Sequence, residues 1–400
     1  MAESIENYCV VYFGNDWSGE SRTSSHHIAA RLSSATRVLY VETPGMRAPQ
    51  AHARDFRKLF RKLTAALAPP VRAHDRLHIL TLPQIPFRKL PLVGLLNRIA
   101  GRWAVGRALR RLGFDRVISW FVVPHPGALA GRLGERLVVY YCIDDYAAFP
   151  GVDAASIQAL DDDLTRRADI VFVAASALVE PKRRLNANVR FSPHGVDVDL
   201  FARADDSATE PAEATRGLQR PVIGYFGNIG PWIDRGLLLE IARRRPEWTL
   251  LLVGHVTAPV EELRSCPNVM FAGQQRYESL FHWAAAFDVA VIPYLQTRQV
   301  RNANPLKLRE YLATGKPVVT VTTPETVRFG GVVALADTPE DFVAAIERAL
   351  AEDTPELHSR RRSSVRDASW DARFRETVAA VEQTLARHEA EGNVERELSR

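Results

Sequence analysis

Residues 302–319 read NANPLKLREYLATGKPVV, and they combine the signals of a short helix with those of a buried strand. Asn304 is of a type that caps helices, and Pro305 suits the first helical position. Gly315 suits the position just past a helix, where the backbone turns left-handed. The segment therefore predicts a helix over residues 306–313 and an apolar strand directly after it.

The rest of the chain alternates apolar strands with helical segments, which is typical of parallel sheets covered by helices. We expect strands at residues 9–13, 37–41, 77–82, 116–121, 137–142, 170–174, 189–191, 222–226, 249–253, 269–271, 288–292 and 317–321. Further helices are expected at residues 26–32, 235–244, 277–286 and 339–351. The predicted fold class is α/β, with two Rossmann-like, doubly wound parallel sheets facing a central cleft.

The chain has 400 residues, more than one hydrophobic core usually supports, so two domains are expected. Residues 203–220 are polar and lack apolar periodicity, as an exposed connector does. We predict an N-terminal domain over residues 1–202, a linker over 203–220 and a C-terminal domain over 221–370. Residues 371–400 are expected to form a helix that packs back towards the N-terminal domain.

The composition argues against several classes of protein. The three cysteines lie far apart and have no Cys or His neighbours at metal-ligand spacing, so neither disulfides nor a zinc site is expected. No run approaches the roughly 18 apolar residues of a membrane span, and the start of the chain lacks the apolar core of a signal peptide. We therefore expect a cytoplasmic protein that needs no metal and no other cofactor.

Lys307 and Glu310 stand three residues apart, and so share one face near the start of the predicted helix. A lysine at a helix entrance offers a charge-assisted contact to phosphate, and a carboxylate one turn on accepts hydrogen bonds from ribose hydroxyls. The pair suits a nucleotide diphosphate. The alternative is a solvent-exposed ion pair on the helix, which the same spacing also produces.

A glycine-rich turn follows the strand expected at residues 222–226, where the sequence reads GYFGNIG. Glycine lets the backbone approach a diphosphate, and a nearby arginine adds positive charge. A tight turn without a ligand is the alternative. From this turn, the next strand end and the segment before the helix, we predict these donor-binding residues besides Lys307 and Glu310: Gly227, Asn228, Arg235, Gly254, Arg301, Asn304 and Leu306. For Arg301, the alternative is a solvent-exposed side chain that contacts no ligand.

The pattern N-P-x-K-x-x-E-Y-x-A-x-G-K-P-V-V resembles the donor-site helix of retaining glycosyltransferases of the GT-B fold. Residues 190–201, RFSPHGVDVDLF, resemble the segment that closes the acceptor domain in those enzymes. The chain is thus similar to the glycosyltransferases of group 1 or family 4, including those of exopolysaccharide and teichuronic acid biosynthesis in bacteria. The resemblance implies that Lys307 contacts the donor phosphates and Glu310 the ribose.

One position departs from this resemblance. Many of these enzymes have a second glutamate eight residues before the ribose-binding one, where this chain has Asn302. A neutral amide cannot stabilise positive charge as a carboxylate does, so retention and inversion of the anomeric centre both stay open.

Two adjacent carboxylates, Asp144 and Asp145, follow the strand expected at residues 137–142. One of them is expected to take the proton from an acceptor hydroxyl, with its pKa raised by its neighbour and by burial. We favour Asp145, in similarity to inverting GT-B enzymes such as exopolysaccharide glucuronosyltransferases. His27, beside His26, is a further candidate base. Helix capping is the alternative for all of them.

Residues 47–116 carry 16 Lys and Arg against three Asp, a net charge of +13 in a chain whose total is +5. Between residues 54 and 116 the basic side chains alternate with large apolar ones, a pattern that binds the surface of anionic membranes. No nucleic-acid-binding module is visible, so nucleic acid is not an expected partner. A basic face with no partner is the remaining alternative.

Together these features predict a glycosyltransferase that moves a sugar from a UDP- or GDP-sugar to a hydroxyl of a polysaccharide or lipid-linked glycan precursor. We expect it to act in cell-envelope biosynthesis, peripherally associated with the inner face of the plasma membrane. The alternatives are a nucleotide-sugar epimerase of the same fold and a non-catalytic sugar-binding protein.

Overall fold

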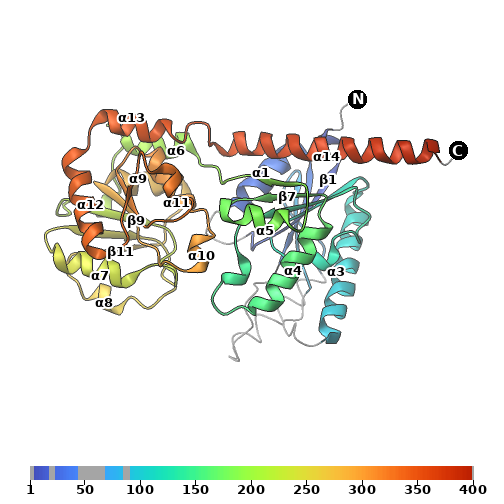
Figure 1. Cartoon of the computed structure of the whole chain (residues 1–400), viewed down its shortest axis with the longest axis horizontal. Coiled ribbons are helices and arrows are strands. Elements are labelled where there is room, and N and C mark those ends of the chain that lie inside the picture. The colour runs from blue at the N-terminus through green and yellow to red at the C-terminus, as the bar shows by residue number, and fades with distance from the viewer. Residues whose placement is uncertain (1–3, 18–22, 44–67, 84–90, 399–400) are drawn as a thin grey trace. The chain divides into compact units, whose positions relative to one another are not determined.

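The computed structural model describes residues 4–17, 23–43, 68–83 and 91–398, which form two compact units (Figure 1). Unit 1 comprises Met1–Pro193 together with Phe374–Arg400, and unit 2 comprises His194–Arg373. The chain therefore leaves unit 1, builds the whole of unit 2, and returns to unit 1.

Unit 1 contains an eight-stranded sheet in the order β3-β4-β2-β1-β5-β6-β7-β8. Its strands are β1 (Cys9–Gly14), β2 (Arg37–Glu42), β3 (Val71–His74), β4 (Leu77–Thr81), β5 (Val117–Phe121), β6 (Leu137–Cys142), β7 (Ile170–Val173) and β8 (Val189–Phe191). All pairs are parallel except β3 with β4. Strand β3, whose four residues are exposed at the sheet edge, was not predicted from the sequence.

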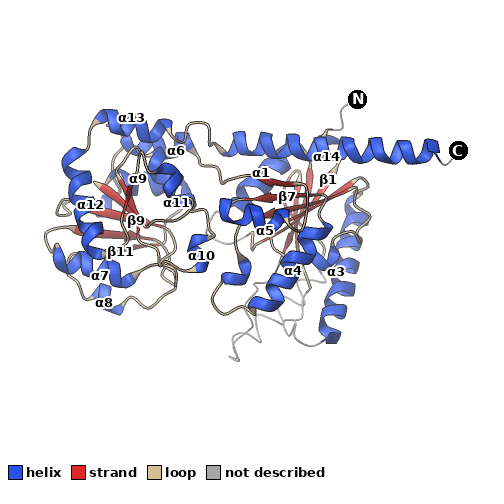
Figure 2. Ribbon diagram, in the orientation of Figure 1, coloured by secondary structure: helices blue, strands red, loops and turns tan. Residues whose placement is uncertain are grey.

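Helices cover both faces of this sheet (Figure 2). They are α1 (Ser24–Ala35), α3 (Pro91–Leu112), α4 (Ala154–Arg167), α5 (Val179–Arg183) and α14 (Trp370–Leu398). The neighbours Tyr140 and Tyr141 of β6 point to opposite faces, as successive strand residues do. The hydroxyl of Tyr140 bonds to Asp161 of α4, whereas that of Tyr141 donates to the Ser192 carbonyl at 3.1 Å. Thr377 of α14 lies 3.4 Å from the Ser192 hydroxyl, so α14 packs on the second face.

Unit 2 contains a six-stranded parallel sheet in the order β11-β10-β9-β12-β13-β14. Its strands are β9 (Val222–Phe226), β10 (Thr249–Val253), β11 (Val269–Gly273), β12 (Val289–Ile292), β13 (Val318–Thr320) and β14 (Ala334–Leu335). Its helices are α6 (Val198–Ala202), α7 (Arg235–Arg244), α8 (Glu261–Arg264), α9 (Leu280–Ala285), α10 (Arg298–Arg301), α11 (Leu306–Ala313), α12 (Pro339–Glu352) and α13 (Pro355–Ser363). The helix predicted at residues 306–313 is confirmed as α11.

The segment 203–220, predicted as an exposed linker, is counted with unit 2. Ala204 and Thr215 are buried, and the amide of Ala212 donates to the carbonyl of His282 at 3.0 Å. The segment folds into short 3-10 turns, which satisfy its polar backbone without the apolar periodicity of a helix or strand.

The two segments that join the units run side by side. Val196 donates its amide to the carbonyl of Ala368 at 2.9 Å, and Trp370 donates to Val196 at 3.3 Å. A Cβ atom on Gly195 would lie 2.7 Å from the Cα of Trp370, so only glycine permits this approach. Trp370 itself is buried and opens α14.

Candidate functional site

The first group of predicted site residues lies in unit 2, where the parallel neighbours β9 and β10 end. Gly227 follows β9 with φ of 131°, and Gly254 follows β10 with φ of 151°, values that L side chains rarely adopt. A Cβ atom on Gly254 would lie 1.9 Å from the carbonyl oxygen of Gly227. At Gly254 the nearby backbone leaves no room for a Cβ atom, and at both positions the positive φ disfavours L side chains. Both strand ends therefore require glycine.

Lys307 lies directly over this turn. A Cβ atom on Gly227 would lie 1.8 Å from Cε and 2.4 Å from Nζ of Lys307, so the lysine stem occupies the space that the glycine leaves open. Its Nζ is 5.7 Å from the centre of the Tyr225 ring. Gly227 and Lys307 are 80 residues apart in the sequence. Their contact places one ammonium group next to the backbone of the glycine turn.

Glu310 lies one helical turn beyond Lys307 and is buried, with 9% of its surface exposed. Burial raises the pKa of its carboxyl to about 7, and the charge of Lys307 opposes this shift. Within the described parts of the chain, no group donates a hydrogen bond to its side chain. A buried carboxylate without donors is unfavourable, and ligand hydroxyls would supply them.

Asn304 does not cap α11 as predicted. Pro305 occupies the N-cap position without a side-chain bond, and Oδ1 of Asn304 accepts a hydrogen bond from Arg309 at 2.5 Å. Arg309 is buried, so its guanidinium needs an acceptor nearby, and this need outweighs the capping preference. Leu306 is half-buried in the first turn of the helix.

Three other predicted donor residues point to protein groups or to solvent. Arg235 donates to the carbonyl of Pro259 at 2.6 Å, and Oδ1 of Asn228 accepts from Thr257 at 3.2 Å. Arg301 is exposed at the end of α10, in the segment before α11. The structure therefore brings together Gly227, Gly254, Lys307 and Glu310, and gives Arg235 and Asn228 other partners.

The second group lies in unit 1, after β6. Asp144 is half-buried, and its pKa is raised to about 7 by burial and then by the negative charge of Asp145. Asp145 is buried, and its side chain does not cap the 3-10 turn Tyr146–Ala148 that follows it. Asp144 thus has the raised pKa that was expected of the base, a role for which the sequence analysis favoured Asp145.

The histidines of α1 differ in their contacts. Nδ1 of His26 forms a capping box with Thr23, at 3.2 Å from its amide and 2.9 Å from its hydroxyl, and Nε2 lies 3.1 Å from the carbonyl of Asp16. The capping alternative therefore holds for His26. His27 is half-buried beside it.

Sequence reasoning missed one carboxylate at the same edge of the sheet in unit 1. Glu42 ends β2, and its pKa is raised by burial and by the charge of Asp16. It accepts hydrogen bonds from the amide of Trp17 at 2.9 Å and from Thr81 at 3.2 Å. The signal was available, because Glu42 directly follows the strand predicted at residues 37–41.

The basic region 54–116 is described only over residues 68–83 and 91–116, and its other residues lie outside the described structure. Helix α3 exposes an apolar stripe, with Leu92 at 73%, Leu95 at 42%, Leu96 at 50%, Ile99 at 56% and Trp103 at 50%. At 100° per residue these positions lie on one face, opposite the buried Val105 and Ala108.

Two absences apply to the part of the chain that the structure describes. No helix there combines the length and apolar character needed to cross a bilayer. No group of three or more His, Cys, Asp and Glu side chains is arranged there to hold a metal ion.

Comparisons with known proteins agree on the class of protein. Residues 220–352 match the model of the family "Glycosyl transferases group 1". Over 285 residues, 66% of this chain and 71% of the relative, the sequence is 28% identical to TuaH of Bacillus subtilis, whose name assigns it to the glycosyltransferases of teichuronic acid biosynthesis.

Two solved structures are similar over nearly the whole chain. Sucrose-phosphate synthase from Thermosynechococcus elongatus superposes with a TM-score of 0.70 at 17% identity, covering 95% of this chain and 99% of its own. HepE of Anabaena, in complex with UDP and glucose, superposes with a TM-score of 0.64 at 14% identity, covering 93% and 98%. The predicted GT-B fold is confirmed.

Proposed function

Because the chain is a glycosyltransferase of the GT-B fold, we propose that it transfers a sugar from a UDP- or GDP-sugar to a hydroxyl of a polysaccharide or lipid-linked glycan precursor. Two names support the details of this proposal. TuaH is named for the synthesis of a cell-envelope polymer, and the HepE structure contains UDP and glucose.

The observation that carries the proposal is the position of Lys307 over Gly227, with the buried Glu310 one turn along the same helix. In the proposed complex the ammonium group and the glycine backbone contact the diphosphate. The carboxylate of Glu310 accepts hydrogen bonds from the ribose hydroxyls, which provide the donors that it lacks among the described residues.

For the transfer we assign the base to Asp144. Its carboxylate takes the proton from the acceptor hydroxyl while the hydroxyl oxygen forms a bond to the anomeric carbon. The bond between that carbon and the diphosphate oxygen breaks, and the diphosphate leaves with its negative charge next to Lys307. We propose that these protein groups act without a metal ion.

The proposal is tested with the purified full chain and a panel of UDP-, GDP- and dTDP-sugars. Anionic liposomes carrying extracted lipid-linked glycans serve as acceptor, and both nucleotide release and the mass of the glycolipid are measured. We expect release of UDP or GDP with a matching gain of one sugar on the glycolipid. Isomerised donor, or free sugar formed regardless of acceptor, would favour an epimerase or hydrolase instead.

We further propose that the chain acts at the inner face of the plasma membrane through the exposed stripe of α3. Besides its apolar face, this helix carries five arginines and no acidic residue, which suits an anionic lipid surface. Insertion of the stripe would bury its leucines and Trp103 among the acyl chains, with arginines beside the headgroups.

Replacing Leu96 and Ile99 together by Asp is therefore expected to weaken sedimentation with anionic liposomes by about tenfold or more, since two apolar contacts are lost and two negative charges are added. Val327→Asp in unit 2, where the valine is 53% exposed, is the matched control and should change little. If both variants and the unchanged protein bind the liposomes equally, α3 does not contact the membrane.

A further inference from the structure

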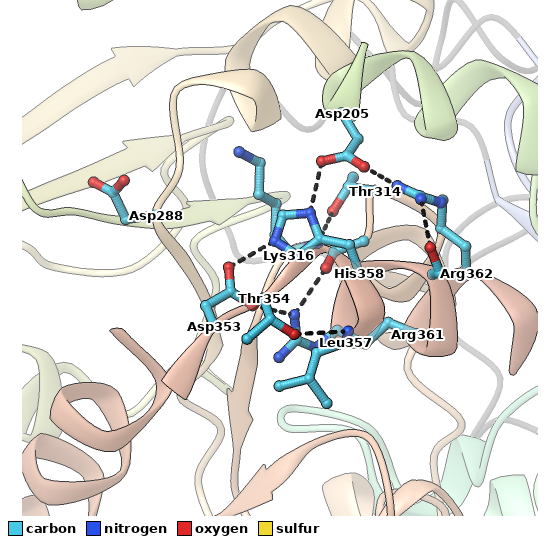
Figure 3. A network of polar contacts seen from close by, with 12 residues as sticks. Asp205, Asp288, Thr314, Lys316, Asp353, Thr354, Leu357, His358, Arg361 and Arg362 are labelled. Atoms are coloured by element: carbon cyan, nitrogen blue, oxygen red, sulfur yellow. Dashed lines mark hydrogen bonds and ion pairs between the residues drawn. The ribbon is translucent and has the colours of Figure 1, made fainter. Parts of the chain in front are cut away.

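A compact ionic network lies at the opposite end of α11 from Lys307 (Figure 3). His358 of α13 stands at its centre, with Nδ1 2.7 Å from Asp205 and Nε2 2.6 Å from Asp353. Arg361 donates to the other oxygen of Asp353 at 2.7 Å, and Arg362 donates to the other oxygen of Asp205. We call these five residues the ionic clasp.

The geometry of the clasp requires a particular form of His358. A carboxylate oxygen only accepts hydrogen bonds, so each ring nitrogen must donate to satisfy its partner. Only the doubly protonated, positively charged imidazole has two donors. In the neutral ring one nitrogen would point its lone pair at a carboxylate oxygen. That hydrogen bond would be lost, and the lone pair and the oxygen would repel each other.

Charged groups from several elements lie in the network and beside it. They are Asp205 before the loop to β9, Asp353 between α12 and α13, Arg361 and Arg362 of α13, and Lys316 and Asp288 before β13 and β12. Burial lowers the pKa of Lys316, with Arg220 acting in the same direction and the two nearby carboxylates against it. The side chain of His358 is 19% exposed, so solvent screens the network only in part.

The clasp holds the end of α11. Gly315, with φ of 78°, follows that helix, and its carbonyl accepts a hydrogen bond from Arg361 at 3.0 Å. A Cβ atom on Gly315 would lie 2.9 Å from Arg362 Nη1 and 3.3 Å from His358 Cβ. Three clasp residues therefore enclose the turn that ends the helix, and positive charge at that end also stabilises the helix dipole.

We propose that His358 is a positioning residue for the donor site and that the proton on its ring makes the placement of α11 sensitive to pH. Helix α11 connects the clasp to the proposed donor site. α11 spans only Leu306–Ala313, so a clasp at one end restrains Lys307 and Glu310 at the other. The effect on donor binding rests on the proposed function of those two residues, whereas the restraint on the helix does not.

The test separates these two parts with two measurements, each made as a profile from pH 5 to pH 9. Hydrogen exchange of the amides in residues 306–315, corrected for intrinsic rates, reports the restraint on α11 without any ligand. Calorimetric titration with UDP and with GDP reports donor-site affinity. The variants are His358→Gln, which carries no charge and has both of its donors on one nitrogen, and Asp205→Asn, which removes one charge but keeps the shape. His388→Gln is the control, since that histidine lies 3.7 Å from Asp169 in unit 1.

In the unchanged protein and in the control we expect protection of residues 306–315 to fall by about tenfold as pH rises, because one charge-assisted hydrogen bond is lost when the ring loses its second proton. Nucleotide affinity should fall in parallel. His358→Gln should show the weaker protection across the whole pH range, with a flat profile, and Asp205→Asn should flatten the profile in the same way. If the unchanged protein and His358→Gln give the same profile, the clasp does not act through this proton.

The two proposals can fail separately. Normal binding of UDP or GDP without any effect of the clasp variants on exchange or affinity would overturn the positioning role and leave the proposed function standing. Absence of nucleotide binding together with pH-dependent protection that His358→Gln abolishes would support the clasp and contradict the function proposed for α11.

Discussion

Lys307→Ala is expected to reduce kcat/KM for the nucleotide-sugar by about 10²–10³-fold, the usual effect of removing one charged or hydrogen-bonding group from a leaving-group site. The loss should appear in both donor affinity and turnover. In the proposed complex the ammonium group contacts the diphosphate before transfer and stabilises the negative charge that the diphosphate gains as it leaves. Steady-state kinetics and calorimetric titration with UDP or GDP measure the two parts.

Arg348→Ala is the matched control for this substitution. Arg348 is an exposed cation on α12 of the same unit, so its loss changes the net charge of the chain equally without touching the glycine turn. Thermal unfolding of both variants should match that of the unchanged protein. A Lys307→Ala variant that binds and transfers normally would contradict the assignment of this helix to the donor.

Asp144→Asn is expected to lower kcat by about 10²–10⁴-fold while nucleotide affinity stays nearly unchanged, because it removes the proposed general base without touching unit 2. Only the ionised carboxyl can accept a proton. With the pKa of Asp144 at about 7, the rate of the unchanged enzyme should therefore be low in acid and rise as pH increases through that value. A pH profile of kcat/KM for the acceptor measures this.

Asp145→Asn separates the two neighbouring carboxylates. The charge of Asp145 contributes to the raised pKa of Asp144, so its removal should lower that pKa and extend activity to lower pH. The loss of kcat should be much smaller than in Asp144→Asn. The reverse order of the two losses would identify Asp145 as the base, as the sequence alone had favoured.

Local signals in the sequence located the elements that position the candidate site. β9, β10, α7 and α11 have the predicted bounds, since each combines a clear apolar period with glycine or capping residues at its ends. Asn304 shows the limit of such signals. Its type predicts a cap, but the buried guanidinium of Arg309 competes for the same oxygen, and this competition exists only after folding.

Long-range contacts explain most of what could not be predicted. Asp205 and His358 are 153 residues apart, and nothing in the sequence near either residue indicates that they meet. The raised pKa of Asp144 likewise comes from burial and from the charge of Asp145, which strand periodicity does not determine after the strand has ended. Helix α3 lacks a single apolar face, because it is apolar on both its buried and its exposed side.

The return of the chain to unit 1 through α14 has a consequence for synthesis on the ribosome. Unit 1 draws its last helix from residues after Phe374, whereas unit 2 is finished at Arg373. The inserted unit can therefore fold while its host still lacks the helix that contributes Thr377 and Thr384 to its interior. Until then the part of the eight-stranded sheet that α14 covers stays exposed, although α1 already packs on the same face. Unit 1 therefore begins first and is completed last.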